Sequence, residues 1–428
     1  MTILLLNQAF YPDVVSSGQH ASDLAVRLAA LGHQVIVVSS DRAYDDPSRR
    51  FTSSETWNGV QIRRVATLGL GKRSKWTRGI DFGSFLICCL LQLARLPKVD
   101  VAVAMTSPPL IAFIAALFVA CRGGKLVYWV LDLNPDEAIA AGWLRQNSGI
   151  ARILNRISLY TFHHSARIVV LDRFMKARVL EKGVDPAVVQ VIPPWSHDGA
   201  IQRDIEGRAE FRRIHGLEGK FVVMYSGNHS PCHPLASLVE AAGRLKDEPG
   251  IVFCFVGGGS EHAKVRAATT ARGLQNVLCL PYQPIARLAA SLSAADLHAV
   301  VMGDPFVGIV HPCKIYNILQ LGLPVLYIGP SQGHIPDMIP NGGGANWFYS
   351  AAQGDTDSVV QHILSAAKCS RHESSEQVRV AAQFSENSLL FRLTDCIESL
   401  GSSDLSRGRI TSAEGSCSEN LAGSSGTQ

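Results

Sequence analysis

The chain has 428 residues, of which 47% are hydrophobic and 18% are charged, and this balance excludes an intrinsically disordered protein. Its length is enough for two or three domains, and its formal net charge is a mild +4 at pH 7. Ten cysteines are scattered without a C-x-x-C or a disulfide-framework spacing, which indicates a reducing compartment such as the cytoplasm.

The first half of the chain is expected to alternate between strands and helices. The opening MTILLLNQAFYPD lacks the basic segment and the small-residue cleavage site of a signal peptide, so we interpret it as a first strand. The Val, Ile and Leu content of the expected strands is typical of a parallel sheet covered by helices on both faces. These strands are expected at residues 2–10, 34–40, 60–65, 100–107, 125–133, 167–172 and 188–194.

The loop FYPDVVSSGQHAS after the first expected strand is a candidate binding loop. Gly18 introduces a helix there, and a glycine allows backbone N–H groups to approach a phosphate or a sugar closely. An ordinary flexible loop between strand and helix is the alternative interpretation.

Residues 61–96 combine a basic stretch with an apolar one. Residues 61–80 contain six basic residues and no acidic one, and the apolar run FGSFLICCLLQLARL follows. This run is short for a bilayer-spanning helix, so the segment favours contact with an anionic membrane surface, or else a buried helix beside a solvated basic loop. Residues 1–195 carry 22 Lys/Arg against 14 Asp/Glu, but the basic patch is local and no nucleic-acid-binding motif accompanies it, so we expect no nucleic-acid partner.

The stretch VYWVLDLNPDEAIAAG ends a strongly apolar strand with carboxylates. Asp132 could orient a sugar hydroxyl or stabilise positive charge that develops on a sugar ring, which makes it a candidate catalytic residue. Asp136 and Glu137 are equally explained as charges in the first turn of a helix.

A second series of strands is expected at residues 221–227, 251–259, 277–283, 297–303 and 324–330. Two such series predict an α/β protein with two doubly wound, Rossmann-like domains. The polar, proline-containing stretch 193–204 marks their junction, so we predict domains at 1–195 and 196–382. A helix beginning after Ser385 and ending near residue 400 is expected next, and the Ser/Gly-rich residues 401–428 are predicted to be disordered.

Two loops of the second series are candidate binding sites for an anion. Gly227 and Asn228 end a strand in MYSGNHSPCHPL, where His229, Cys232 and His233 form only a weak zinc motif, and no metal is expected. The second loop, GIVHPCKIYNILQLG, has Gly308 before a helix whose first turn carries Lys314, with Asn317 on the same face. A cation at a helix start favours a bound phosphate, and a solvated lysine is the alternative.

Taken together, these motifs resemble glycosyltransferase family 4, in the branch near bacterial surface-polysaccharide transferases. The resemblance is carried by FYPDVVSSGQHAS, TSPPLIAF, LDLNPDEAIAAGWL, YSGNHSP, FVGGGSE and PCKIYNILQLGLPVL, and it spans about residues 1–400. It implies two facing Rossmann-like domains of GT-B type, with the acceptor on the first domain and the donor on the second. It also implies that the helix at 383–400 crosses back to the first domain.

The resemblance further implies a retaining transfer of a hexose from a UDP- or GDP-sugar, with no cofactor and no metal ion. The acceptor would be a lipid-linked sugar or a polysaccharide on the cytoplasmic side of the membrane. Asp132 is expected beside the donor sugar, and Lys314, Gly18 and Gly308 beside the diphosphate.

The chain departs from the family pattern at two places. The family has two glutamates in the last binding loop, where this chain has Ile309 and Asn317, and a nearby Asp304 is mis-spaced. The usual arginine after the glycine of YSGN is replaced by Asn228. Two alternatives therefore remain open, a catalytically degenerate protein that binds a nucleotide sugar or a partner, and a sugar-nucleotide epimerase.

Overall fold

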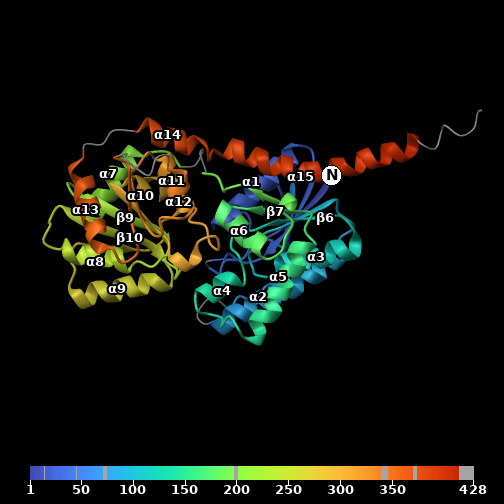
Figure 1. Ribbon diagram of the computed structural model, residues 1–428, viewed down its shortest axis with the longest axis horizontal. Helices are drawn as coiled ribbons and strands as arrows, with labels where there is room; N and C mark the ends of the chain where they lie inside the picture. Colours follow the sequence, from blue (N-terminus) through green and yellow to red (C-terminus); the bar gives the residue numbers. More distant parts are fainter. Residues whose placement is uncertain are drawn as a thin grey trace, which may run out of the picture. The chain divides into compact units, whose positions relative to one another are not determined.

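The computed structural model describes residues 1–13, 15–44, 46–70, 75–196, 201–339, 346–369 and 374–413. These residues form two separate β-sheets, and helices pack around each of them (Figure 1). By density of contacts the chain divides into one unit of Met1–Tyr128, His164–Ile168 and Phe391–Gln428 and a second of Trp129–His163 and Val169–Leu390. The domain limits given above are not tested by this division, which passes through the first sheet, and they stay predictions.

The first sheet has the strand order β3-β4-β2-β1-β5-β6-β7-β8. The pairs β1–β2, β1–β5, β2–β4 and β5–β6 are parallel, which confirms the expected parallel sheet. Each expected strand of the first half is present, and most are shorter than predicted. The strands are β1 (Thr2–Leu6), β2 (Gln34–Ser40), β3 (Ser54–Trp57), β4 (Val60–Val65), β5 (Val101–Ala104), β6 (Lys125–Trp129), β7 (Arg167–Val170) and β8 (Val189–Val191).

Strand β3 was not predicted, because its four residues alternate weakly and lie at the edge of the sheet. It pairs antiparallel with β4 through a two-residue turn at Asn58 and Gly59, with Trp57 opposite Val60. Both turn residues have positive φ, at 47° and 82°, which is the geometry that Asn-Gly supplies in a hairpin. The dipeptide Asn-Gly was therefore the available signal.

The helices that accompany the first sheet follow the apolar periodicity of the sequence. In α1, for example, Leu24, Ala25 and Leu28 recur at helical spacing and are fully buried, and Gly32 with a φ of 87° follows its end. The helices are α1 (Ser16–Ala30), α2 (Lys75–Ala94), α3 (Ile111–Arg122), α4 (Asp136–Ala140), α5 (Gly149–His163) and α6 (Arg173–Glu181).

The second sheet is parallel throughout and has the order β11-β10-β9-β12-β13-β14. Its two halves diverge from β9 and β12, which is the doubly wound arrangement predicted from the sequence. The strands are β9 (Phe221–Asn228), β10 (Ile251–Gly258), β11 (Val277–Leu280), β12 (Leu297–Val301), β13 (Val325–Ile328) and β14 (Phe348–Ala351), of which β14 was not predicted.

The helices of the second sheet include α11, which begins two residues later than the sequence suggested. Pro312 and Cys313 precede it, and Cys313 is the N-cap residue. These helices are α7 (Ile205–Ile214), α8 (Ala236–Arg244), α9 (Ser260–Arg272), α10 (Leu288–Ser293), α11 (Lys314–Gln320), α12 (His334–Met338), α13 (Thr356–Lys368) and α14 (Ser375–Ala382).

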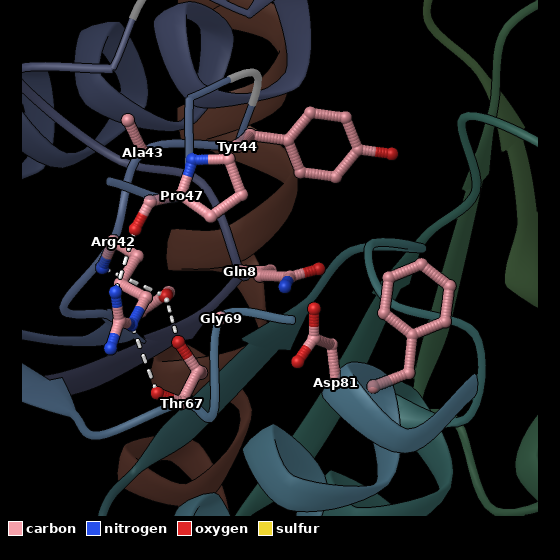
Figure 2. Close-up of a pocket in the computed structure, with 10 residues that line it drawn as sticks. Gln8, Arg42, Ala43, Tyr44, Pro47, Thr67, Gly69 and Asp81 are labelled. Atoms are coloured by element: carbon pink, nitrogen blue, oxygen red, sulfur yellow. Dashed lines mark hydrogen bonds between the residues drawn. The ribbon is translucent and has the colours of Figure 1, made fainter. Parts of the chain in front are cut away.

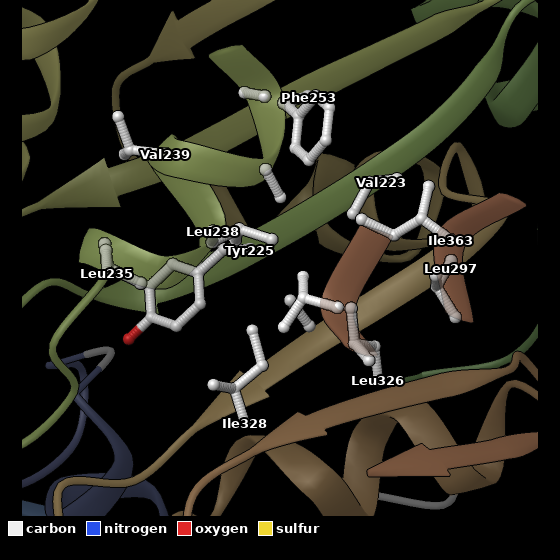
Figure 3. Packing of buried hydrophobic residues seen from close by; sticks show 14 of the residues in the cluster. Val223, Tyr225, Leu235, Leu238, Val239, Phe253, Leu297, Leu326, Ile328 and Ile363 are labelled. Atoms are coloured by element: carbon white, nitrogen blue, oxygen red, sulfur yellow. The ribbon is translucent and has the colours of Figure 1, made fainter. Parts of the chain in front are cut away.

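The core of the second sheet shows why its strands are apolar along their whole length. In β9, Val223 and Tyr225 point toward α8 and α13, where they meet Leu238 and Ile363 (Figure 3). The alternate residues of β9, Val222 and Met224, belong to a separate cluster on the opposite face with Phe211 of α7. Burying each of these large side chains is worth roughly 1.5–3 kcal/mol, so both faces hold the sheet rigid beneath its loops.

The C-terminal part of the chain forms α15 (Glu386–Ala413), which starts directly after Ser385 as predicted. The helix continues past residue 400 into the stretch expected to be disordered, because no proline interrupts it and an established helix extends readily. His33 contacts Glu398 at 2.8 Å, and Lys125 Nζ donates to the carbonyl of Leu400 at 2.7 Å, so α15 is joined to residues of its own compact unit. Residues 414–428 of the predicted tail and residues 197–200 of the predicted junction lie outside the described residues.

Candidate functional site

The most unusual charge of the second compact unit is the ammonium group of Lys314. Its Nζ atom is buried, has no hydrogen-bond partner among the described residues, and lies 3.6 Å from the ring centroid of Tyr225. The aromatic face offers the cation only partial compensation for lost water. Burial lowers the pKa of Lys314 to about 7, and the neighbouring Cys313 opposes this shift. The structure therefore holds a poorly solvated cation, a state that a bound anion would relieve.

Gly227 forms the wall next to this ammonium group. It has a φ of 123°, and a Cβ atom added to it would lie 3.5 Å from Lys314 Nζ. A Cβ on Gly257 would lie 2.1 Å from the carbonyl oxygen of Gly227, and one on Gly259 would lie 2.3 Å from that of His229. The ends of β9 and β10 thus approach each other backbone to backbone, which glycine alone permits. Asn228 lies between them at the end of β9 with an exposed side chain.

Asp132 lies at the carboxyl end of β6 and pairs with Val310 in an isolated antiparallel bridge, and Leu133 N donates to Ile309 O at 2.8 Å. These contacts bring Asp132 beside the loop that leads to Lys314. Burial, with a smaller contribution from Glu137, raises the pKa of Asp132 to about 8. A carboxyl group that is neutral at pH 7 can hydrogen-bond a hydroxyl, but it does not stabilise positive charge.

Gly308 lies in the same loop, and its φ of 72° requires glycine. A Cβ atom there would lie 2.7 Å from the carbonyl of Phe174 at the start of α6, so the absence of a side chain allows close packing against this helix. Arg178 of α6 donates from Nε to Val307 O at 3.1 Å. Gly308 therefore positions the loop, and the predicted contact of this glycine with a phosphate stays a prediction.

Asn317 lies one turn beyond Lys314 on α11 and is partly exposed. Its side-chain amide makes no hydrogen bond to the part of the chain that the structure describes. The structure thus brings Gly227, near the end of β9, beside Lys314, at the start of α11. Asn228 and Asn317 are placed near them by their positions on these two elements.

Gly18 belongs to the other compact unit and lies within the first turn of α1. A Cβ atom there would lie 3.3 Å from Ala9, so Gly18 allows α1 to pack closely on the loop after β1. Ser22 Oγ donates to the Gly18 carbonyl at 2.8 Å and accepts from Tyr11 N at 3.1 Å, which holds this loop in place. This accounts for the glycine without a ligand, although the predicted role in donor binding remains a prediction.

A second buried polar cluster lies beside the helix that carries Lys314. His311 Nδ1 donates to Asp172 Oδ2 at 2.8 Å, and Tyr316 donates its hydroxyl proton to His311 Nε2 at 2.5 Å. His334 Nε2 in turn donates to the Tyr316 oxygen at 2.8 Å. Ligand atoms of Asp172, His311 and His334 lie within 4.8 Å of one another, a spacing that a metal ion could use. A metal would have to displace hydrogen bonds that already satisfy each of these groups.

The histidine-rich loop after β9 does not form the zinc site that was weighed from the sequence. His229 Nδ1 donates to Gly227 O at 2.9 Å, and His233 Nδ1 donates to Val301 O at 2.7 Å. Burial raises the pKa of the Cys232 thiol to about 12, which opposes the thiolate form that zinc requires. The contact between His229 and His262 of α9, whose ring centroids lie 4.9 Å apart, was not predicted, because it is not local in sequence.

Two further acidic candidates of the sequence are Asp136 and Asp304. Asp136, in the first turn of α4, forms an ion pair with Lys182 at 2.9 Å. Asp304 begins the short 3-10 helix η3 (Asp304–Phe306), and it is not among the groups that shift the pKa of Lys314. Among the described residues, neither carboxylate hydrogen-bonds the ammonium group of Lys314.

The first compact unit has a pocket beyond the carboxyl ends of β1, β2 and β4, which is where doubly wound sheets bind ligands (Figure 2). Arg42 forms one wall and is held by the carbonyls of Thr67 at 3.0 Å and Pro47 at 2.7 Å. The side chains of Gln8, Tyr44 and Asp81 line the opening. The pocket offers about 40 Å³ of space.

Helix α2, within the basic and apolar segment 61–96, has two apolar faces. Phe85, Cys89 and Leu93 are at most 1% exposed, whereas Ile87 is 63% and Leu91 is 56% exposed. Among the described residues no helix is both long enough and apolar enough to cross a bilayer. Residues 71–74 of the basic stretch lie outside the described residues.

Comparisons with known proteins agree with this architecture. Residues 17–195 match the model of the glycosyl transferase 4-like domain. The chain is 27% identical over 337 residues to a protein named as the colanic acid biosynthesis glycosyl transferase WcaI of Escherichia coli strain K12, covering 75% of this chain and 82% of that protein. It is 26% identical over 262 residues to a protein of Pseudomonas aeruginosa named as the glycosyltransferase WbjE, covering 61% and 65% of the two chains.

Solved structures show the same fold. Sucrose-phosphate synthase from Thermosynechococcus elongatus superimposes with a TM-score of 0.73 at 14% identity, covering 94% of this chain and 100% of that one. HepE of Anabaena, solved with UDP-glucose, gives a TM-score of 0.69 at 14% identity over 93% and 100% of the two chains. WaaG, a glycosyltransferase involved in lipopolysaccharide biosynthesis, gives 0.61 at 16% identity over 90% and 100%.

Proposed function

Because residues 17–195 match the glycosyl transferase 4-like domain and the chain has the GT-B fold, we propose that it is a family 4 glycosyltransferase. In this proposal it transfers a sugar from a UDP- or GDP-sugar to a lipid-linked or saccharide acceptor of a cell-surface polysaccharide. The observation that carries the donor class is the buried, unpartnered ammonium group of Lys314. Relatives named for colanic acid and lipopolysaccharide biosynthesis support the product class. HepE, which binds UDP-glucose, supports a nucleotide-sugar donor.

Departure of the nucleoside diphosphate is the step to which Lys314 would contribute. Negative charge grows on the leaving oxygen as the glycosidic bond breaks, and a cation in a dry site stabilises such charge more than it does in water. Because the ammonium group is already desolvated next to Tyr225, little reorganisation is needed when the anion arrives.

The sugar would be transferred with retention of configuration and without a metal ion or cofactor. In this proposal the acceptor hydroxyl attacks from the face that the diphosphate leaves, and a donor phosphate oxygen accepts its proton. Asp132 would hold a sugar hydroxyl, since its raised pKa of about 8 keeps it a neutral hydrogen-bonding group at pH 7.

Transfer or hydrolysis with a panel of UDP- and GDP-sugars tests the proposed reaction. We expect one donor to react, and proton NMR of the released sugar, recorded before it mutarotates, to show the anomer of the donor. Release of the opposite anomer would contradict retention. Inactivity with every donor and acceptor lipid would favour the non-catalytic alternative, which has no support from the named relatives.

The acceptor is proposed to be reached at the cytoplasmic face of a membrane, which helix α2 would contact. The exposed residues Ile87 and Leu91 lie four apart on α2, and Ile80, which is 49% exposed, is seven residues before Ile87, so the three form one apolar stripe. Such a stripe next to basic residues fits an anionic lipid surface.

Co-sedimentation with vesicles of phosphatidylglycerol and phosphatidylethanolamine tests this surface. Exchanging Ile87 and Leu91 for glutamine should reduce the bound fraction, whereas Ile205→Gln, at a residue that is 72% exposed elsewhere, should leave it unchanged. Equal binding of both variants would argue against α2 as the lipid-facing element.

A further inference from the structure

Three buried nitrogen atoms around the ends of β9 and β10 have no hydrogen-bond partner among the described residues. They are Nζ of Lys314, Nε2 of His229 and Nε2 of His262. They come from α11, the end of β9 and α9, three elements that are distant in sequence. A buried polar atom without a hydrogen-bond partner lowers the stability of the folded protein, so the presence of three such atoms near one loop requires an explanation.

The three groups are connected through His229. The ring centroid of His229 lies 4.8 Å from that of Tyr225 and 4.9 Å from that of His262. Lys314 Nζ lies over the same Tyr225 ring at 3.6 Å. Gly227 lies next to both Lys314 and His229. Its lack of a Cβ atom leaves room for Lys314, and its carbonyl oxygen accepts a hydrogen bond from His229 Nδ1.

The hydrogen bond made by His229 Nδ1 determines whether Nε2 is a hydrogen-bond donor or an acceptor. Nδ1 must carry the proton, because it donates to the carbonyl of Gly227 at 2.9 Å. In the neutral ring Nε2 is then an acceptor only, and an acceptor repels an anion. If Nε2 gains a proton, the ring becomes a cation with a donor directed away from Gly227.

We propose that His229 takes up a proton from solvent when the donor diphosphate binds, and that His229 and His262 complete with Lys314 one anion-binding subsite. This inference rests on the proposed function and deepens it, because it assigns the role of the missing loop arginine to histidines. No covalent bond changes in this step. The proton moves from water to Nε2 of His229, and the resulting imidazolium donates to a phosphate oxygen.

The surroundings of His229 favour its neutral form in the free protein. Burial, followed by the charge of Lys314, lowers the pKa of His229 to about 4, and burial lowers the pKa of His262 as well. The carboxylate of Glu261 next to His262 is paired with Lys264 at 2.6 Å. The titratable and charged groups that face His229 from the surrounding elements are Tyr225, His233, Glu261, His262, Tyr282 and Lys314, with Arg266 beyond His262.

A bound diphosphate would favour the protonated form of His229 over the neutral form. Two phosphate charges next to His229 favour the imidazolium, so its pKa is higher in the complex than in the free protein. Binding then takes up a proton wherever the pH lies between the two pKa values. Affinity is highest at low pH and falls as the pH rises, by up to about tenfold per pH unit for one proton.

Isothermal titration calorimetry with UDP-glucose and GDP-mannose measures this uptake directly. The two phosphates of a nucleotide sugar keep a constant charge in this range, so the protein supplies the titrating groups. Repeating the titration at about pH 6 in buffers of different ionisation enthalpy counts the protons taken up, and at that pH Lys314 is already charged in the free protein. We expect uptake of between half a proton and one proton.

Variants of His229 and His262 show which imidazole takes up the proton on binding. His229→Gln should nearly abolish the uptake at about pH 6 and flatten the affinity between about pH 5 and pH 6, below the range in which Lys314 titrates, and His262→Gln should weaken binding at every pH. His362 of α13, which is half-buried far from Lys314 in the chain, provides the matched control, and His362→Gln should behave as the wild type. Nitrogen-15 NMR of the imidazoles should show the Nδ1–H tautomer of His229 in the free protein and both nitrogens protonated in the complex.

The two proposals fail in different ways. Tight binding of a nucleotide sugar with no proton uptake, and with His229 neutral in the complex, would overturn the inference and leave the proposed function standing. Absence of binding by the wild-type protein at every pH would overturn both. Because proton uptake and the NMR tautomer are measured on the wild-type chain, a variant that does not fold cannot obscure the result.

Discussion

Two buried polar clusters of the same compact unit lie on either side of the start of α11, and they differ in how completely they are satisfied. Around His311, a chain of hydrogen bonds runs from Asp172 through His311 and Tyr316 to His334. Around Lys314, three residues farther along the chain, buried nitrogen atoms have no hydrogen-bond partner in the described part of the chain. A satisfied cluster fixes structure, whereas an unsatisfied one stores a free-energy cost that a ligand can remove.

The contrast implies different responses to mutation. The His311 cluster joins the cap of α6 to the turn before α11, since Asp172 Oδ1 also accepts from Met175 N at 2.8 Å. Its loss should appear first as lost stability. The Lys314 cluster should show the opposite behaviour, with lost binding and unchanged or improved stability.

The largest expected effect is that of Lys314→Met. Removing a buried, unpaired ammonium group should stabilise the free protein by about 2 kcal/mol while weakening nucleotide-sugar binding by about 100-fold. Denaturant unfolding and calorimetry measure the two quantities.

Lys182→Met is the matched control, because Lys182 is paired with Asp136 at 2.9 Å. It should lose stability and keep its donor affinity. If Lys314→Met destabilises the protein as Lys182→Met does, the ammonium group of Lys314 is not an unsatisfied charge in the free protein.

Asp172→Asn should produce the second largest effect. It removes the acceptor of His311 and the charge that caps α6, which should cost about 2–3 kcal/mol of unfolding free energy. His311, hydrogen-bonded to Asp172, holds the pKa of Asp172 below its usual range although burial acts in the opposite direction, so this stability is present above about pH 4 and is lost as the pH falls through the folded-state value. Urea unfolding at several pH values measures it.

The donor affinity of Asp172→Asn is the second readout. It should change only a few-fold, by about 0.5 kcal/mol, because the cluster positions the turn without touching the donor. A change as large as that of Lys314→Met would place Asp172 in the binding site itself.

The pH dependence should separate stability from binding in the wild-type chain. Burial lowers the pKa of His233 to about 3 and that of His298 to about 4, so the unfolded state binds protons that the folded state does not. The free energy of unfolding should therefore fall by about 2 kcal/mol per histidine between about pH 7 and pH 5.

Nucleotide-sugar affinity should rise over the same interval if His229 takes up a proton. Urea unfolding curves and calorimetric titrations at matched pH values give both trends. Parallel trends, with affinity and stability falling together, would mean that binding follows folding alone.

The smallest effect is expected for Asn317→Ala. The amide lies one turn from Lys314 and makes no hydrogen bond to the described part of the chain, so its removal costs no stability. Loss of one neutral hydrogen bond to the donor should weaken binding about three- to tenfold. Unchanged affinity would exclude Asn317 from the donor site.

The sequence predicted those parts of the fold that local pattern controls. The apolar runs of β9 and β10 marked a covered parallel sheet, and Ser385 marked the start of α15. The edge strand β3 was missed, since its signal is the Asn-Gly turn and not an apolar run.

The site was predictable from the sequence only where a residue type is unusual for its position in a helix. Lys314 was found because a lysine is unusual in the first turn of an apolar helix. Its neighbours Tyr225, His229 and His262 could not be found in this way, because their contacts join elements far apart in the chain. For the same reason the pairing of Asp172 with His311, 139 residues apart, had no signal in the sequence.

The charge state of Lys314 in the presence of the donor tests the central claim most directly. Carbon-13 NMR of the lysine Cε resonance, assigned by its loss in Lys314→Met, follows the titration of this one ammonium group. We expect a pKa of about 7 in the free protein and a clear rise when a nucleotide sugar is bound. A pKa that stays the same with the donor bound would contradict the account, because a diphosphate at this site cannot leave the neighbouring cation unaffected.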